Sequence, residues 1–167
     1  MKSRIAIVVD DSRWRDRVPD VARVCRRAAR SALGGVPDPG RPVELCVMLA
    51  DDATVAGLNR RFRGRRGPTN VLSFPDRTPH PPRKPRSCAA CEEGAAMSIG
   101  DIALAFETVV REARRDGKTV PDHVAHLVVH GVLHLLGHDH MKKADAAGME
   151  ALEVAALARL GVENPYD

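Results

Sequence analysis

The chain has few aromatic residues, few cysteines and no long apolar run, and each shortage argues against a class of protein. Its 167 residues include three Phe, one Trp and one Tyr, which leaves Leu, Val, Ala and Ile to build the core. So few aromatic side chains weaken any hypothesis in which bases stack on an aromatic platform. No stretch approaches the roughly 18 apolar residues of a membrane span, and the first residues do not resemble a signal peptide. We therefore expect a cytoplasmic chain that does not bind membranes.

The four cysteines fall into two groups. Cys25 and Cys46 lie in apolar, periodic segments and are predicted to be reduced core residues. Cys88 and Cys91 lie within residues 76–97, a stretch rich in proline and arginine that is predicted to be a surface loop. Cysteines at this spacing form half of a zinc site or a redox pair, but no second such pair completes a four-cysteine site. An incidental loop pair is therefore the simpler interpretation.

The residues that are abundant indicate a globular chain with an acidic partner. Hydrophobic residues make up 44%, enough for a core, and the length fits one domain over residues 1–167. The formal net charge is +4, and most of the 26 basic residues are arginine. This balance favours a partner such as nucleic acid. A genome that is rich in G and C would produce the same arginine content, so composition leaves both explanations open.

Hydrophobic periodicity predicts both strands and helices. Runs of β-branched and apolar residues predict strands, and apolar residues at helical spacing predict helices. The predicted strands are residues 4–9, 42–50, 69–74 and 98–105, and the predicted helices are residues 19–33, 51–62, 106–116, 121–136 and 142–160. This order predicts an α+β fold with a mixed β-sheet of about four strands and a C-terminal helical layer.

Three histidines in the second half of the chain have the spacing of a metal site. His130 and His134 are four residues apart on a predicted helix, so both imidazoles can reach one ion. Gly137 is predicted to end that helix in a left-handed conformation, which lets the chain return His140 as a third ligand. Three imidazoles leave a fourth position open, which indicates a catalytic Zn²⁺ ion. Nickel and copper remain alternatives.

Other polar residues beside this motif have less certain roles. His126 either supports the metal ligands or packs beside them, and His123 is predicted to be structural. Asp139 either accepts a hydrogen bond from a ligand imidazole or caps the turn. His138 is predicted to be exposed.

The glycine that follows the first predicted ligand argues against peptidase activity. The spacing H-x-x-x-H-x-x-G-x-x-H matches the metzincin proteases, in which a glutamate that acts as general base follows the first histidine. Gly131 occupies that position here. A peptidase mechanism is therefore disfavoured, and the site needs another way to activate water or stabilise charge.

Five arginines (Arg60, Arg61, Arg63, Arg65 and Arg66) crowd into seven positions before the strand at residues 69–74. Such a cluster binds phosphates through charge and paired hydrogen bonds. A solvated basic turn is the plain alternative. If the fold brings the cluster beside the metal, an arginine there can stabilise the negative charge of a phosphoryl transition state.

Three sequence blocks, in this order, resemble the bacterial YbeY family: LNRRFRG with PTNVLSFP, then IGDIAL, then HGVLHLLGHDH. The resemblance spans about residues 44–141. It implies a single-strand-specific, zinc-dependent endoribonuclease that acts in 16S rRNA 3′-end maturation, ribosome biogenesis and ribosome quality control. It also implies a fold related to zinc metalloproteases, with a zincin-like metal-binding helix and the strand at residues 70–74 beside the cleft. The loop at residues 76–97 is longer than the family leads us to expect.

The resemblance assigns roles to four residues. His130, His134 and His140 match the zinc ligands, and Arg63 matches an arginine important for function, here predicted to bind the scissile or the adjacent phosphate. RNA, the ribosome and 30S assembly components are the implied partners. The proton acceptor stays open between activated water, the RNA 2′-hydroxyl and His138. Two rival hypotheses are a ribosome-assembly or RNA-binding factor whose zinc is structural, and a zinc peptidase.

Overall fold

The computed structural model describes residues 2–76, 96–138 and 143–166, and for residues 143–145 it describes the backbone alone. Residues 77–95, with Cys88 and Cys91, lie outside the described residues, so the predicted surface loop stays a prediction. Along the described chain the elements are β1 (Ser3–Val9), α1 (Arg13–Arg17), α2 (Val21–Leu33), β2 (Val43–Ala50), α3 (Asp52–Arg63), β3 (Val71–Pro75), β4 (Met97–Ala105), α4 (Phe106–Arg115), α5 (Val120–Leu135) and α6 (Lys143–Ala158).

These elements confirm the predicted α+β class. Each predicted strand and helix is present, with ends that differ by at most two residues. The short helix α1 was not predicted, because five residues contain too little periodicity to detect. Its Trp14 is fully buried and donates a hydrogen bond from Nε1 to the carbonyl of Ala50 at 3.0 Å.

The four described strands form one mixed sheet in the order β1-β2-β4-β3. β1, β2 and β4 run parallel, whereas β3 pairs antiparallel with β4 and places Ser73 opposite Ile102. Within the described part of the chain, β3 is therefore an edge strand. One side of its backbone pairs with β4, and the other side can meet a side chain or a ligand.

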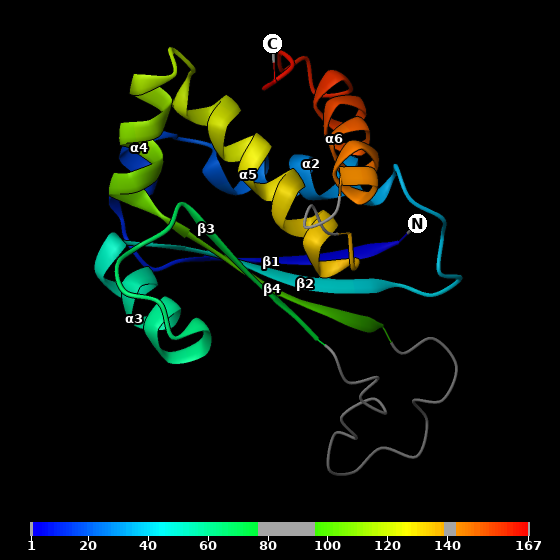
Figure 1. Cartoon of the computed structure of the whole chain (residues 1–167), viewed down its shortest axis with the longest axis horizontal. Coiled ribbons are helices and arrows are strands. Elements are labelled where there is room, and N and C mark those ends of the chain that lie inside the picture. Colours follow the sequence, from blue (N-terminus) through cyan, green and yellow to red (C-terminus); the bar gives the residue numbers. More distant parts are fainter. Residues whose placement is uncertain (1, 77–95, 139–142, 167) are drawn as a thin grey trace.

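The helices cover the two faces of the sheet unequally (Figure 1). α2 and α5 lie against one face, α6 packs on both of them, and α3 lies on the opposite face. The larger core fills the first layer and includes the buried Cys25, whereas Cys46 is half-exposed, so its prediction as a core residue was wrong. A smaller apolar cluster between α3 and the sheet contains Val55 and Leu72. Within the described residues, no helix is both long and apolar enough to cross a bilayer.

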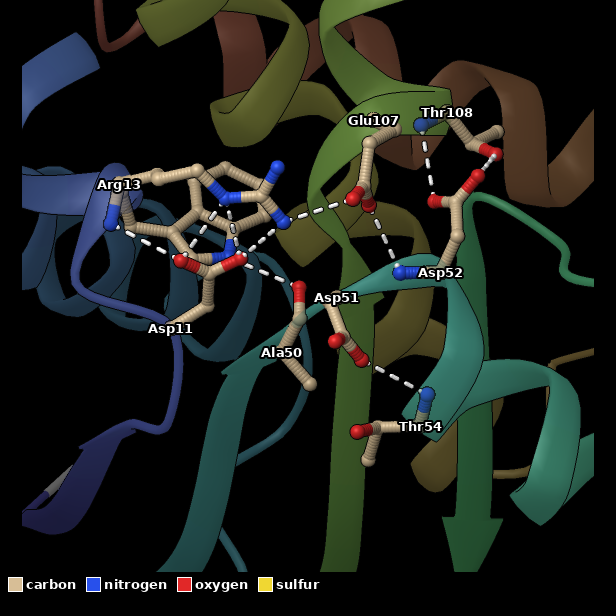
Figure 2. Close-up of polar contacts among 9 residues, drawn as sticks. Asp11, Arg13, Ala50, Asp51, Asp52, Thr54, Glu107 and Thr108 are labelled. Carbon is tan, nitrogen blue, oxygen red and sulfur yellow. Dashed lines mark hydrogen bonds and ion pairs between the residues drawn. The ribbon is translucent and has the colours of Figure 1, made fainter.

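Figure 2 shows how polar side chains join the carboxyl ends of the three parallel strands. Arg13 pairs with Asp11 and with Glu107, each at 2.6 Å. Glu107 accepts a hydrogen bond from the backbone N–H of Asp52 at 2.8 Å, and Asp52 accepts one from the backbone N–H of Thr108 at 2.9 Å. α3 and α4 thus cap each other's N-termini. Ligands often bind at this edge of an open sheet, but here these carboxylates are engaged in holding the helices.

Candidate active site

Helix α5 carries the histidines and has well-defined ends. Thr119 caps its first turn. At the other end Gly137 has a φ of 90°, its N–H donates to the carbonyl of His134, and the N–H of His138 donates to the carbonyl of Leu133, both at 3.0 Å. This pair of bonds is the helix-ending motif that a left-handed glycine permits. The prediction for Gly137 is confirmed.

His130 and His134 point their Nε2 atoms at each other across one helical turn. The two nitrogens are 3.0 Å apart, and the ring planes meet at 78°. Two nitrogens bound to one tetrahedral zinc ion at about 2.05 Å each would be about 3.3 Å apart. The pair therefore fits two ligands of such an ion. Within the described residues no group of three or more metal-ligating side chains comes together, and His140, the predicted third ligand, lies outside them.

A buried glutamate lies behind this pair. Glu153 on α6 is fully buried, and its Oε1 is 2.6 Å from Nδ1 of His130. Its Oε2 accepts a hydrogen bond from the hydroxyl of Tyr166 and lies 3.6 Å from Nε2 of His126. Burial alone would raise the pKa of Glu153, but the hydrogen bonds from His126, His130 and Tyr166 outweigh burial and lower that pKa to about 2.

The charge on Glu153 determines which nitrogen of His130 holds the hydrogen. An ionised carboxylate only accepts hydrogen bonds, so Nδ1 of His130 must carry a hydrogen and donate it. In the neutral ring Nε2 then has a lone pair directed at His134. A metal ion or a hydrogen must lie between two such nitrogens, because their lone pairs repel each other. A carboxylate, an imidazole and a metal in this order are a common arrangement in zinc proteins.

Gly131 on α5 lies close against the sheet. A Cβ added to it would be 2.9 to 3.2 Å from three side-chain carbons of Ile102 on β4. Ile102 is fully buried, so it has little room to retreat. The position that holds the general base in metzincins is therefore turned into the core here, and a glutamate at this position would not fit without moving α5.

Arg63 reaches the outer edge of the sheet from the end of α3. Its Nη2 donates a hydrogen bond to the carbonyl of Ser73 on β3 at 2.8 Å. Ser73 is paired with Ile102, and Ile102 contacts Gly131, the neighbour of His130. Arg63 and His130 therefore lie at the same level of the sheet, with the edge strand between α3 and α5. The remaining arginines of the cluster are exposed in α3 and the turn that follows.

The other histidines separate into distinct roles. His123 is buried, and its Nε2 is 2.9 Å from Glu112 on α4, a carboxylate that Asn70 also contacts at 2.9 Å. This geometry supports the structural interpretation of His123. His126 lies 3.6 Å from Glu153 through its Nε2, and its ring also meets the ring of His130 in a T-shaped contact with centroids 6.5 Å apart, so it both contacts the buried glutamate and packs beside the histidine pair. His138 is half-buried rather than exposed, and Asp139 lies outside the described residues.

Sequence reasoning missed Glu153 and Tyr166. Both are far from the histidine motif along the chain, and Glu153 is 23 residues from the histidine it contacts. One signal was present: Met149, Glu153, Ala156 and Leu157 form one buried stripe of α6. A glutamate in the apolar stripe of a helix is costly to bury unless it has partners.

The fold and the site together define an α+β chain with paired histidines on a helix beside an antiparallel edge strand. The family model for "Endoribonuclease YbeY" matches residues 9–161. A curated protein of that name from Paramagnetospirillum magneticum is 50% identical over 162 residues, covering 97% of this chain and 94% of the relative. One from Cereibacter sphaeroides is 43% identical over 169 residues, covering 99% of this chain and all of the relative.

The chain therefore belongs to the endoribonuclease YbeY family. The solution structure of TM1509 from Thermotoga maritima is similar, with a TM-score of 0.54 and 20% identity, and the match covers 98% of this chain and 96% of that one. At that identity the structural likeness supports the fold alone.

Proposed function

We propose that this chain cuts single-stranded RNA at a zinc site formed by His130, His134 and His140. As a member of its family the chain is an endoribonuclease, a hydrolase that acts on RNA. The observation that carries the metal proposal is the pair of Nε2 atoms 3.0 Å apart, one of them backed by Glu153. Imidazoles oriented in this way match the donors that Zn²⁺ prefers.

Each group of the site would have its own role at the phosphodiester bond. A bound zinc ion would act as a Lewis acid toward a phosphoryl oxygen. Arg63 would hold the scissile or adjacent phosphate with its remaining N–H groups, since one Nη2 is held by Ser73. Because the carbonyl of Ser73 fixes the position of the guanidinium, its other N–H groups are available to stabilise the negative charge that develops on the phosphate. Glu153 would keep His130 in the tautomer that presents Nε2.

The nature of Gly131 supports RNA over peptides as the substrate. A peptidase of the metzincin kind needs a carboxylate after the first ligand. Here that position is buried against Ile102. A peptide-cleavage assay at stoichiometric zinc is expected to give no activity above a metal-free control.

We propose ribosomal RNA as the substrate, with maturation of the 16S 3′ end and ribosome quality control as the setting. This places the chain in the cytoplasm, with 30S assembly components as partners. The family resemblance supports these finer assignments. Cleavage of a single-stranded fragment from the 16S 3′ region, compared with the same fragment annealed to its complement, tests them. Equal cleavage of both forms would contradict strand specificity.

The decisive test replaces His130 with alanine. Zinc content of the purified chain is expected to fall, and RNA cleavage is expected to drop to the level of a metal-free preparation. Arg114→Ala removes an exposed arginine from α4 and serves as the control for surface change. Undiminished cleavage by the His130→Ala chain would refute the proposal.

The main alternative is a ribosome-assembly factor whose zinc is structural. It predicts that His134→Ala mainly lowers thermal stability, while Arg63→Ala weakens RNA binding and neither changes a cleavage rate above background. The enzyme proposal predicts instead that both variants lose cleavage and that Arg63→Ala keeps its zinc. The two hypotheses therefore differ in whether His134→Ala and Arg63→Ala lower the rate of RNA cleavage.

A further inference from the structure

Phe62 is the most exposed large apolar side chain of the described residues, at 58%. The whole chain has three phenylalanines, one tryptophan and one tyrosine, so an aromatic ring in water is a rare use of a scarce residue. Phe62 is the last residue but one of α3, on the side of that helix that faces the sheet. It extends past the small apolar cluster between α3 and the sheet instead of filling it.

Two neighbours hold this ring in place. Phe74 on β3 contacts it edge to face, with ring centroids 5.3 Å apart and planes at 68°. The guanidinium of Arg61 lies over the ring, 5.2 Å from its centroid. An edge-to-face aromatic pair of this geometry is attractive beyond the burial of its surface. The ring is therefore held by two neighbours, while much of its surface stays in water.

The surface around Phe62 is strongly positive. Residues 53–75 contain no aspartate or glutamate and hold the five arginines of the cluster. In the part of the chain that the structure describes, none of these arginines forms an ion pair. Arg60 and Arg66 border a hollow of about 510 Å³ on the outer side of α3. Such a surface is complementary to a polyanion.

Phe62 is also continuous with the candidate active site. Its neighbour Arg63 binds the carbonyl of Ser73, and its ring partner Phe74 follows Ser73 on the same edge strand. Ser73 lies at the level of the histidine pair through Ile102 and Gly131. α3 and α5 lie on opposite faces of the sheet, so an RNA strand that contacts both Phe62 and the histidine pair would pass around the edge strand β3.

We infer that Phe62 is a nucleobase-stacking residue, which holds one unpaired base of an RNA strand whose phosphates contact the neighbouring arginines. The inference rests on the proposed function and adds to it a base subsite beside the edge strand. Every base has a π-face, so a single ring of this kind binds without reading sequence. A paired base has both faces covered by its stack, so the subsite favours single strands. Arg61 can stack on the same base and donate to its phosphate.

The test compares Phe62→Leu and Phe62→Trp with the unchanged chain. Leucine keeps the helix propensity and the apolar contact with Phe74 but removes the π-face, whereas tryptophan keeps a face. Affinity is measured with short single-stranded 2′-deoxy oligonucleotides, which present bases and phosphates but are no substrate for a ribonuclease. Matched oligonucleotides carry abasic sites at every position. Val8→Ala, at an exposed apolar residue on β1, is the control variant.

The expected result is a loss that depends on the bases. Phe62→Leu should bind the intact oligonucleotide roughly tenfold more weakly, because it loses one stacked base. It should bind the abasic oligonucleotide as tightly as the unchanged chain does. Phe62→Trp should retain affinity, and its exposed indole emission should be quenched by the intact oligonucleotide alone. Phe62→Leu should leave the salt dependence unchanged, whereas Arg61→Gln should lower its slope by about one.

Two results would overturn the inference. One is an unchanged affinity of Phe62→Leu for the intact oligonucleotide, and the other is an equal loss with the abasic one. Either result leaves cleavage by the unchanged chain intact, so the proposed function survives it. Conversely, if the unchanged chain cleaves no RNA but the Phe62→Trp chain shows base-dependent quenching, the enzyme proposal is refuted and the subsite is retained.

Discussion

The close approach of α5 to the sheet can be tested by adding one methyl group at Gly131. An alanine there places Cβ 2.9 Å from Cδ1, 3.1 Å from Cγ2 and 3.2 Å from Cγ1 of Ile102. Two of these carbons are attached to the branched Cβ of a stiff side chain, so they cannot turn away independently. Gly148 on α6 is the matched control, because a Cβ added there meets no atom within 4 Å.

The expected change in the free energy of unfolding is the balance of two opposing effects, helix propensity and overpacking. Alanine is favoured over glycine inside a helix by about 0.8–1.0 kcal/mol, and this gain should be seen nearly in full at Gly148. At Gly131 the same gain is offset by overpacking, which costs about 1–3 kcal/mol in a well-packed core. We therefore expect Gly148→Ala to stabilise the chain by about 0.5–1 kcal/mol and Gly131→Ala to destabilise it by about 1 kcal/mol.

Denaturant unfolding of the metal-free chain, followed by circular dichroism, measures both changes. A second substitution, Ile102→Val, removes Cδ1, the atom nearest to the added methyl, and costs about 0.5–1.5 kcal/mol by itself. In that background Gly131→Ala should be less harmful by about 0.5–1 kcal/mol, which a double-mutant cycle would reveal. If Gly131→Ala stabilises the chain as much as Gly148→Ala does, the contact with Ile102 is not limiting. The structural argument against a glutamate at this position then fails.

Three further predictions concern the metal ligands, the phosphate contact and acid stability. Glu153→Gln should weaken zinc binding by about 10- to 100-fold, the usual effect of losing a carboxylate behind a ligand imidazole. Competition with a chromophoric chelator measures this affinity. An unchanged affinity would show that the carboxylate does not orient His130. Arg63→Lys should lower kcat/KM for RNA nearly as far as Arg63→Ala does. An ammonium cannot keep the hydrogen bond to Ser73 and also bind a phosphate through a second pair of donors. Full activity of the lysine variant would contradict this paired contact. The hydrogen bonds from Thr54 hold the pKa of Asp51 below its ordinary 3.8, so their stabilisation is present above that pH and is lost as the pH falls through the lowered pKa. Asp51→Asn keeps the helix cap and should flatten this acid loss in pH-dependent unfolding, whereas an unchanged pH profile would assign the loss to other carboxylates.

The sequence alone was enough to predict every element of this fold except the five-residue helix α1, because each of the others has a strong local pattern. β2 alternates buried and half-buried residues, and α5 ends at a glycine whose left-handed conformation could be foreseen. The order of the strands could not be predicted in this way. The insertion of β4 between β2 and β3 depends on contacts between residues about 50 apart, which no local pattern encodes. The placement of α3 on the face opposite α2 and α5 could not be predicted from local patterns either.

The candidate site likewise has features that could be predicted from local sequence patterns and features that could not. The spacing of His130 and His134 was readable because a helix turns a four-residue interval into a shared face. The absence of a general base at Gly131 was also readable, but its cause, the contact with Ile102, was not. Glu153 could have been suspected as a charge in an apolar stripe, although its partner could not have been named. The exposure of Phe62 was invisible, since an apolar residue on the inner face of a helix is normally buried.

Three separate contacts fix α5, and together they explain how two imidazoles can be held ready for a ligand. Gly131 sets the distance from the helix to the sheet, and His123 ties its first half to Glu112 on α4. Glu153 then fixes the rotation of the His130 ring from α6. Each contact restrains a different degree of freedom, so metal binding need not pay for ordering the helix or for choosing a tautomer. A stiff helix that presents paired histidines, near a helix α3 that carries exposed arginines, is suited to a long, flexible polyanion, because the protein supplies the order that the substrate lacks.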